Sequence, residues 1–398
     1  MWAGVGGRIR HHREALGWSQ ARLAREICRA AGVPPDRLGR VDVYRWETGR
    51  RRPTVWLPFV VRALGVPLYA LDASAATLAE LVPRSERLGG ARGRERGGRR
   101  IGEGEVRDLT ARVHGLRLAD DVLAGGDLLG PAARELDAAV RLHGEASYSE
   151  QVGRRLLLAI GELAQIVGWI ASDAGQYDRA ADIYRLGVSA AREAADGTLT
   201  GQLMGTMGYQ FSNTGRVRDG VTLAEGALAA AGEDAPPRAR ALFWDRVAWA
   251  RAKAGEAGAA VRALGEAAEA LDRHGAQGGG PAEPAWLYWV DAGELRVMEA
   301  RCFTELHRPL KAVPLLTEVL AGYDATRARE LALYLSWLAV AYADANEPEA
   351  AAGTARRVLE LAAEIASERT AERARVVLAG LARYVDVPQV GRLLAEYA

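Results

Sequence analysis

The stretch from Val41 to Pro53, VDVYRWETGRRRP, decides how the amino-terminal part of the chain folds. A glycine at position 49 followed closely by a proline is a typical helix stop signal, so the pattern predicts a short helix that ends near Gly49. Val43 and Trp46 stand three residues apart, which places them on one face of this helix, where they can pack inward. The residues left on the outward face are Asp42, Tyr44 and Arg45.

A run of consecutive arginines follows the predicted helix. These arginines put positive charge where the helix would meet the molecule on which it docks. A short helix with a polar outer face and an arginine run has the size and charge expected of a helix that enters the major groove of DNA. The pattern therefore predicts double-stranded DNA as a partner. The expected contact residues are Asp42, Tyr44, Arg45, Arg50, Arg51 and Arg52.

Two further blocks flank this stretch, Ser19-Gln20-x-x-Leu23-Ala24 before it and Leu64-Gly65-Val66 after it. Together with Trp46-Glu47-x-Gly49-x-x-x-Pro53, they resemble the Cro/C1-type (XRE) helix-turn-helix domain over roughly the first seventy residues. In that family the glutamine at the place of Gln20 hydrogen-bonds a DNA phosphate, so the resemblance adds Gln20 to the expected contacts. The alternative is a small helical bundle that serves only as a cap or a dimerisation module.

One segment departs from the family pattern. The family has a turn of a few residues between its second helix and its recognition helix, whereas this chain has Arg29–Arg40, which contains Pro34 and Pro35. We therefore expect a longer second helix and a proline-containing loop before the recognition helix.

Charge is distributed unevenly along the chain. Residues 1–105 contain 20 Arg and Lys against 11 Asp and Glu, so the other residues carry the remaining 32 and 40 of the totals of 52 and 51. A basic amino-terminal part and an acidic body suit a protein whose first domain binds nucleic acid and whose body does not. The residues between the two, 83–105, are dense in Gly and Arg and lack apolar periodicity, which predicts a flexible linker between domains 1–82 and 106–398.

From residue 106 onward the composition is helical throughout, with breaks that recur about every forty residues. Small residues recur in the first helix of each predicted pair, at Gly168, Gly208, Ala248, Ala300 and Ala339. A turn position follows each of them, at Gly175, Gly215, Gly255, His307 and Asn346. The pattern resembles tetratricopeptide repeats with lengthened helices or loops, and small residues are expected where paired helices cross. The predicted fold class is all-α, a helix-turn-helix bundle followed by an α-solenoid of tetratricopeptide-like helical pairs.

Aromatic residues of the repeat domain are the candidates for a ligand site. The stretch PAWLYWVD at 284–291 is the densest of them, and concave aromatic surfaces of repeat proteins hold peptides or small molecules. The alternative is that the rings fill contacts between repeats, with Trp286 and Trp289 packed inward and only Tyr288 exposed. The candidate ligand-binding residues are Tyr288, Trp249, Tyr334 and Tyr342.

The sequence contains no catalytic or metal-binding constellation. A phosphate-binding Gly-x-x-x-x-Gly-Lys-Ser/Thr loop is absent, and the six histidines lack metal-ligand spacing. We therefore predict no enzyme activity, no cofactor and no metal. Only Cys28 and Cys302 are present, and the first residues do not form a secretory signal, so a cytoplasmic protein without a membrane partner is expected.

These observations predict a DNA-binding transcription regulator whose repeat domain senses a ligand or a partner. The architecture resembles Gram-positive peptide-responsive regulators, and more closely the long regulators of actinobacteria that join the same first domain to repeats. That resemblance implies a homodimer and a peptide or small-molecule effector. The alternative is a helical-repeat interaction scaffold without specific DNA binding.

Overall fold

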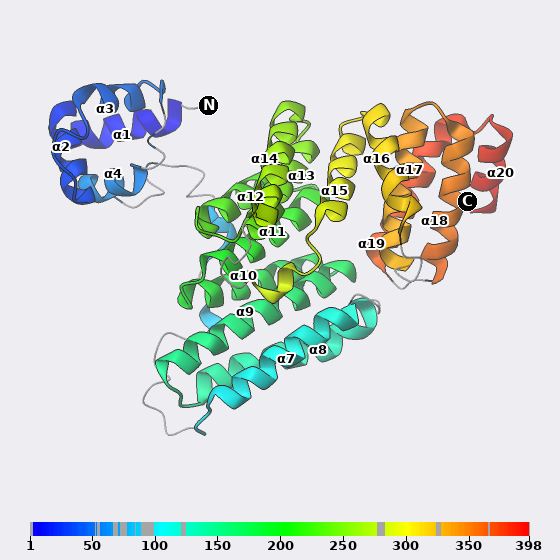
Figure 1. Cartoon of the computed structure of the whole chain (residues 1–398), viewed down its shortest axis with the longest axis horizontal. Coiled ribbons are helices and arrows are strands. Elements are labelled where there is room, and N and C mark those ends of the chain that lie inside the picture. Colours follow the sequence, from blue (N-terminus) through cyan, green and yellow to red (C-terminus); the bar gives the residue numbers. More distant parts are fainter. Residues whose placement is uncertain are drawn as a thin grey trace. The chain divides into compact units, whose positions relative to one another are not determined.

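The computed structural model describes residues 3–51, 53, 56–66, 71, 78–83, 85–88, 99–120, 125–276, 283–323, 328–364 and 367–397. The chain separates into two compact units, Met1–Pro83 and Arg84–Ala398. The predicted all-α class is confirmed, because helices account for almost all regular structure in these ranges and the only other pairing is an isolated bridge between Arg100 and Ser147 (Figure 1). Arg52 lies outside the described residues.

The first unit is a small bundle of α1 (Ala3–Ala15), α2 (Gln20–Ala31), α3 (Arg40–Glu47) and α4 (Leu57–Leu64). Ser19 caps α2 by accepting a hydrogen bond from the backbone N–H of Arg22, and Gly32 ends it at φ 68°. Helix α3 packs on α1 and α2, and α4 packs mainly on α2. The fully buried core side chains in the described residues are Ile9, Leu23, Ile27, Cys28, Val43, Val60 and Leu71.

The expected proline-containing loop before α3 is confirmed. Helix α2 continues to Ala31, and Gly32–Gly39, which contains both prolines, connects it to α3. This connection fixes the start of α3 at Arg40, which the sequence pattern left open.

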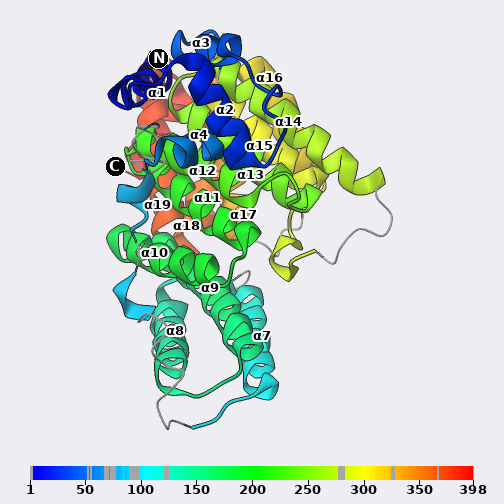
Figure 2. The same ribbon diagram turned by 90° about the vertical axis from the view of Figure 1, so that its left-hand side faces the viewer.

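The second unit is a series of helical pairs (Figures 1 and 2). It begins with α7 (Glu103–Asp120) and α8 (Gly125–Glu145). The pairs that follow are α9 (Glu150–Asp173) and α10 (Tyr177–Glu193), α11 (Gly197–Asn213) and α12 (Val217–Ala231), α13 (Pro237–Lys253) and α14 (Ala257–Ala276), α15 (Ala292–Glu305) and α16 (Pro309–Ala321), α17 (Ala328–Asp344) and α18 (Pro348–Glu364), and α19 (Glu368–Leu381) and α20 (Pro388–Glu396). The odd-numbered helices from α9 to α19 contact one another in sequence and form one layer. Each even-numbered helix from α10 to α18 packs on the odd-numbered helices before and after it.

The small residues predicted at helix crossings lie there. A Cβ added at Gly168 would stand 2.5 Å from the ring of Tyr184, and one added at Gly208 would stand 3.0 Å from the carbonyl oxygen of Gly220. The expected turn positions also share one backbone conformation, since all five have positive φ, including the two that are not glycine, His307 at 52° and Asn346 at 62°. The repeat register taken from the sequence is therefore confirmed at both crossings and turns.

The prediction that residues 83–105 form a flexible linker is wrong at both ends of this segment. The backbone N–H of Ser85 donates to Oγ of Ser189 over 2.8 Å, and Leu88, in the short 3₁₀ helix Glu86–Leu88, is buried against α8 and α10. At the other end Arg100 bridges to Ser147, and α7 begins at Glu103. These residues therefore belong to the second unit. Residues 89–98, the middle of the predicted linker, lie outside the described ranges.

Helices from the two ends of the series contact each other. The hydroxyl of Ser367, which caps α19, donates to Oδ1 of Asp173 at the end of α9 over 3.1 Å. Nε of Arg369 lies 3.3 Å from the same oxygen. Arg329 of α17 lies 3.4 Å from Asp120 at the end of α7. The layer of odd-numbered helices therefore closes on itself.

One helix in the described ranges is long and apolar enough to cross a membrane, namely α9. It forms part of the core of the second unit, where 72% of its most apolar window is buried. This burial is typical of a core helix.

Candidate functional site

The outer face of α3 carries the residues predicted to face outward. Val43 and Trp46 are buried, with 0% and 3% of their surface exposed. Tyr44 is 43% exposed, and Arg45 is also exposed. Arg50 lies over the Tyr44 ring, with its guanidinium carbon 5.6 Å from the ring centroid. Arg45, Arg50 and Arg51, called the arginine edge from here on, are all exposed. The predicted orientation of α3 is confirmed; DNA contact stays a prediction.

Asp42 has a structural role that the sequence reasoning did not assign. Its Oδ2 accepts a hydrogen bond from the backbone N–H of Gly39 over 3.0 Å and so caps the first turn of α3. A helix with glycine at the N-cap lacks a capping side chain of its own, and an acidic residue three positions later is the usual substitute. That spacing could have identified the cap from the sequence.

The end of α3 is held by a buried ion pair. Arg13 donates to Glu47 through Nε over 2.6 Å and through Nη2 over 3.0 Å, and their side chains are only 9% and 3% exposed. The amide Nε2 of Gln20 donates to Oε2 of Glu47 over 2.8 Å. Gln20, a predicted phosphate contact, is therefore also part of the network that fixes α3 against α1 and α2.

A close approach of α1 and α3 supports the same arrangement. A Cβ added at Gly6 would stand 2.1 Å from the carbonyl oxygen of Trp46, so only glycine allows this spacing. The ion pair and the glycine contact together set the position of α3 from within the unit.

In the second unit, aromatic rings from four of the odd-numbered helices contact one another in one array, called the ring ladder from here on. Ring centroids are 6.0 Å apart for Trp169 and Tyr209, 6.1 Å apart for Tyr209 and Trp249, and 5.4 Å apart for Trp249 and Trp337. These are the spacings that aromatic pairs prefer. The ladder connects α9, α11, α13 and α17.

Arginine side chains cover the faces of these rings. Arg301 of α15 has its guanidinium carbon 4.8 Å from the Trp249 ring, 5.3 Å from the Trp337 ring and 5.5 Å from the Tyr209 ring. Arg373 of α19 lies 3.6 Å above Trp337. Trp249 is therefore buried and in contact with the chain's own side chains, which agrees with the packing alternative for this residue.

Charged groups among the rings have shifted pKa values. Burial by itself would raise the pKa of Tyr209, but the nearby guanidinium groups, that of Arg301 foremost, lower it to about 8. Burial raises the pKa of Asp245, against the attraction of Arg246 and Arg301. Burial lowers the pKa of Arg373 to about 10.

The four predicted ligand-binding residues differ in burial and in their neighbours. Trp249, 2% exposed, belongs to the ring ladder, and Tyr342 packs partly buried in the same hydrophobic cluster. Tyr334 is buried, donates from its hydroxyl to Glu294 over 2.7 Å and contacts the Tyr323 ring. Tyr288 is 42% exposed beside the 3₁₀ turn Ala285–Leu287, as predicted for this stretch.

The sequence reasoning missed Trp169 and Tyr209 of the ladder, although a signal for them was present. Trp169, Tyr209 and Trp249 each follow the small residue of their repeat by one position, and Arg301 holds the same place in the next repeat. Aligning the repeats on the small residue would have placed these four side chains in one column.

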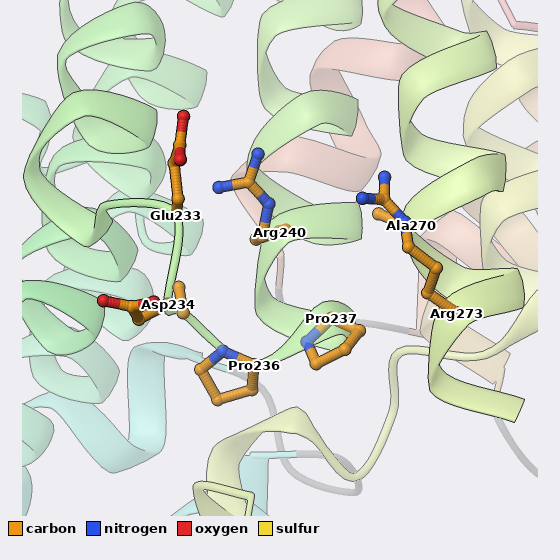
Figure 3. Close-up of a pocket in the computed structure, with 8 residues that line it drawn as sticks. Glu233, Asp234, Pro236, Pro237, Arg240, Ala270 and Arg273 are labelled. Carbon is orange, nitrogen blue, oxygen red and sulfur yellow. The ribbon is translucent and has the colours of Figure 1, made fainter. Parts of the chain in front are cut away.

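A separate surface pocket of about 450 Å³ lies between the α12–α13 connection and α14 (Figure 3). Glu233 and Asp234 are on one side of it, and Arg240 and Arg273 are on the other (Figure 3). Nη1 of Arg240 is already bound to the carbonyl oxygen of Gly232 over 2.8 Å. The pocket mixes both charge signs and points to no particular chemistry. In the described ranges no group of His, Cys, Asp or Glu side chains could hold a metal ion.

Comparison with known proteins gives little further information. No protein-family model matches the chain, and no curated protein matches it. Among solved structures, the crystal structure of BtubC (BKLC) from P. vanneervenii is similar at a TM-score of 0.42 and 16% sequence identity. That match covers 61% of this chain and 92% of the BtubC chain. Function therefore has to be argued from the two regions described above.

Proposed function

We propose that the protein is a sequence-specific DNA-binding transcription regulator of the XRE type, in which α3 is the recognition helix. The observation that carries this proposal is the division of α3 into two faces. Val43 and Trp46 anchor it in the core, while Tyr44 and the arginine edge are exposed.

The dimensions and charge of this face suit the major groove. A helix of eight residues is about 12 Å long, and the groove is about 12 Å wide. Arg45 has the side chain that most often recognises guanine, through two parallel hydrogen bonds to O6 and N7. Arg50 and Arg51 follow the helix and would contact phosphates, which add affinity without sequence preference.

The second unit would then be the regulatory part. The resemblance to regulators with helical repeats implies that two copies associate through this unit, so that two recognition helices would occupy half-sites about 34 Å apart. The same resemblance implies an effector, a peptide or a small molecule, bound by the repeats.

Selection of genomic DNA by the purified full-length protein tests the proposal. We expect a small set of fragments to be enriched, with affinity that falls steeply as salt rises because phosphate contacts release counterions. Enrichment of no fragment above background would contradict the proposal and favour the interaction scaffold.

Two substitutions separate base recognition from phosphate contact. Arg45→Ala should weaken the selected site by about 1–3 kcal/mol and relax the sequence preference. The double change Arg50→Ala and Arg51→Ala should weaken all DNA alike and flatten the salt dependence. Arg62→Ala is the matched control, because Arg62 lies on α4, which packs on α2, and hydrogen-bonds the carbonyl of Ala30. If Arg45→Ala binds the selected site as tightly as the Arg62 control does, the recognition helix is misassigned.

A further inference from the structure

Deeply buried arginines in the second unit generally pair with a carboxylate. Nη1 of Arg117 lies 2.9 Å from Glu162, and Nη2 of Arg329 lies 3.4 Å from Asp120. Pairing of this kind is expected, because a guanidinium removed from water is costly unless an opposite charge compensates it.

Arg301 is an exception. It is 7% exposed, and its hydrogen bonds go to the hydroxyl of Tyr209 over 2.5 Å and to Sδ of Met298 over 3.1 Å. Its Nε is shielded from solvent and has no acceptor. Within the part of the chain that the structure describes, the hydrogen-bond partners of Arg301 are a hydroxyl and a thioether, and neither is a carboxylate.

Among the described residues, Arg373 also lacks a paired carboxylate, and Arg246 has only a long ion pair, to Asp245. Arg246 is 5% exposed, its Nη1 has no acceptor, and the nearest carboxylate oxygen, that of Asp245, is 3.8 Å away. Arg373 donates to Oγ of Ser336 over 3.0 Å, but its Nη2 is shielded from solvent and has no acceptor. Three guanidinium groups therefore present buried N–H donors that nothing in the described structure accepts.

The three groups are gathered on shared rings. Arg301 and Arg373 both lie over Trp337, with guanidinium carbons 5.3 Å and 3.6 Å from the ring centroid. Arg246 and Arg301 both lie over Tyr209, at 4.6 Å and 5.5 Å. The rings hold the flat guanidinium groups in place, so their N–H edges are oriented before any ligand arrives.

A buried acceptor completes the cluster. Asp245 is 0% exposed, and neither of its carboxylate oxygens has a hydrogen-bond partner. The cluster thus combines three guanidinium groups with a carboxylate that lies 3.8 Å from Arg246 but accepts no hydrogen bond. Buried polar groups are normally hydrogen-bonded, so unpaired donors and unpaired acceptors gathered in one cluster are suited to binding a polar ligand.

We propose that Arg246, Arg301 and Arg373 form an internal binding site for a small molecule that carries an oxyanion, a carboxylate or phosphate group. Guanidinium edges bind such groups through paired, charge-assisted hydrogen bonds. Asp245 accepts a hydrogen bond from a hydroxyl or amino substituent of the same molecule. Because arginines already cover the faces of the ladder rings, the ligand does not stack on these rings. It is recognised through hydrogen bonds to its polar groups. The role of this site as an effector site rests on the proposed function. Anion binding by the three arginines does not depend on DNA binding.

Thermal unfolding and calorimetry of the full-length protein test the site, with citrate and inorganic phosphate as probes and chloride at equal ionic strength as the reference. We expect citrate, phosphate or both to raise the unfolding midpoint above that in chloride and to give measurable heat of binding. A response to citrate alone indicates a carboxylate ligand, and a response to phosphate alone indicates a phosphoryl group. If neither probe exceeds chloride, the proposal is overturned.

Substitutions distinguish binding from packing. Arg301→Met and Arg373→Met should each weaken probe binding by about tenfold or more. Without a probe, Arg373→Met should unfold no earlier than the parent, because it removes a buried charge that lacks a counter-ion. Arg369→Met is the matched control on the same helix, since Arg369 pairs with Asp173; it should lower the midpoint and keep the response to the probe.

One result would assign these arginines a purely structural role. If both Met variants unfold earlier and still respond to citrate and phosphate as the parent does, the binding site does not exist. The measurements contain no DNA, so their outcome and that of the DNA selection are independent.

Discussion

The buried ion pair at the end of α3 predicts that Glu47→Ala will destabilise the first unit severely. The carboxylate of Glu47 accepts two hydrogen bonds from Arg13 and one from Gln20, and its side chain is 3% exposed. Removing it leaves the Arg13 guanidinium in the core without its main counter-charge.

The magnitude follows from this geometry. Breaking a buried ion pair by deleting one partner costs about 3–5 kcal/mol. Nη2 of Arg13 also lies 3.2 Å from Glu14, a half-exposed side chain that can compensate in part, so we expect the lower end, about 3 kcal/mol. A unit of this size is stable by about 4–12 kcal/mol, so the change removes a large share of its stability.

Hydrogen exchange of the full-length protein, followed by mass spectrometry, measures the effect on α3 directly. A loss of about 3 kcal/mol should speed exchange of the α3 amides by about a hundredfold. Glu26→Ala is the control, because Glu26 pairs over 2.6 Å with Arg29, which is 77% exposed. Such a surface pair contributes about 0–1 kcal/mol, so exchange should change by less than about fivefold. Equal exchange of α3 in the two variants would refute the reasoning.

Two further predictions concern backbone spacing and pH. Gly6→Ala should destabilise the first unit by about 1–3 kcal/mol, because its Cβ would meet the Trp46 carbonyl oxygen at 2.1 Å. Gly7→Ala, with nothing within 4 Å, should be neutral or stabilising by up to about 1 kcal/mol, and equal melting temperatures would contradict the close approach. Burial raises the pKa of Asp120 to about 6, against the attraction of Arg329. Because this pKa lies above the unfolded value of about 3.9, the ionised carboxylate costs stability above about pH 6, and the cost disappears as pH falls toward about 4. In urea unfolding, the parent should therefore gain up to about 3 kcal/mol relative to Asp120→Asn between pH 7 and 4, and parallel pH profiles would contradict this.

Much of the fold could be predicted from the sequence, because its causes are local. The stop signal at Gly49 and the spacing of Val43 and Trp46 set the end and the inner face of α3. In the second unit, the recurrence of small residues such as Gly168 and Gly208 marks the crossings, where a Cβ would collide. Each of these features acts within one helix or between neighbouring helices.

The features that the sequence did not reveal depend on residues far apart in the chain. Asp173 and Ser367 meet across 194 positions, and no local pattern distinguishes Asp173 from an ordinary surface aspartate. Arg301 and Arg373 look like solvated helix residues until the layer closes around them. The linker prediction failed for the same reason, since a Gly/Arg-rich composition does not show that Ser85 will bond to Ser189.

The contacts between α9 and α19 change how the second unit responds to damage. In an open array each repeat depends only on its neighbours, so the ends fray first and copies can be gained or lost at little cost. Here Asp173, at the end of α9, accepts a hydrogen bond from Ser367 and pairs with Arg369 of α19. Removing the last helical pair, α19 and α20, would therefore leave the buried carboxylate of Asp173 without these partners. A repeat therefore cannot be added or removed without disrupting these contacts. The second unit should unfold in one cooperative transition rather than repeat by repeat.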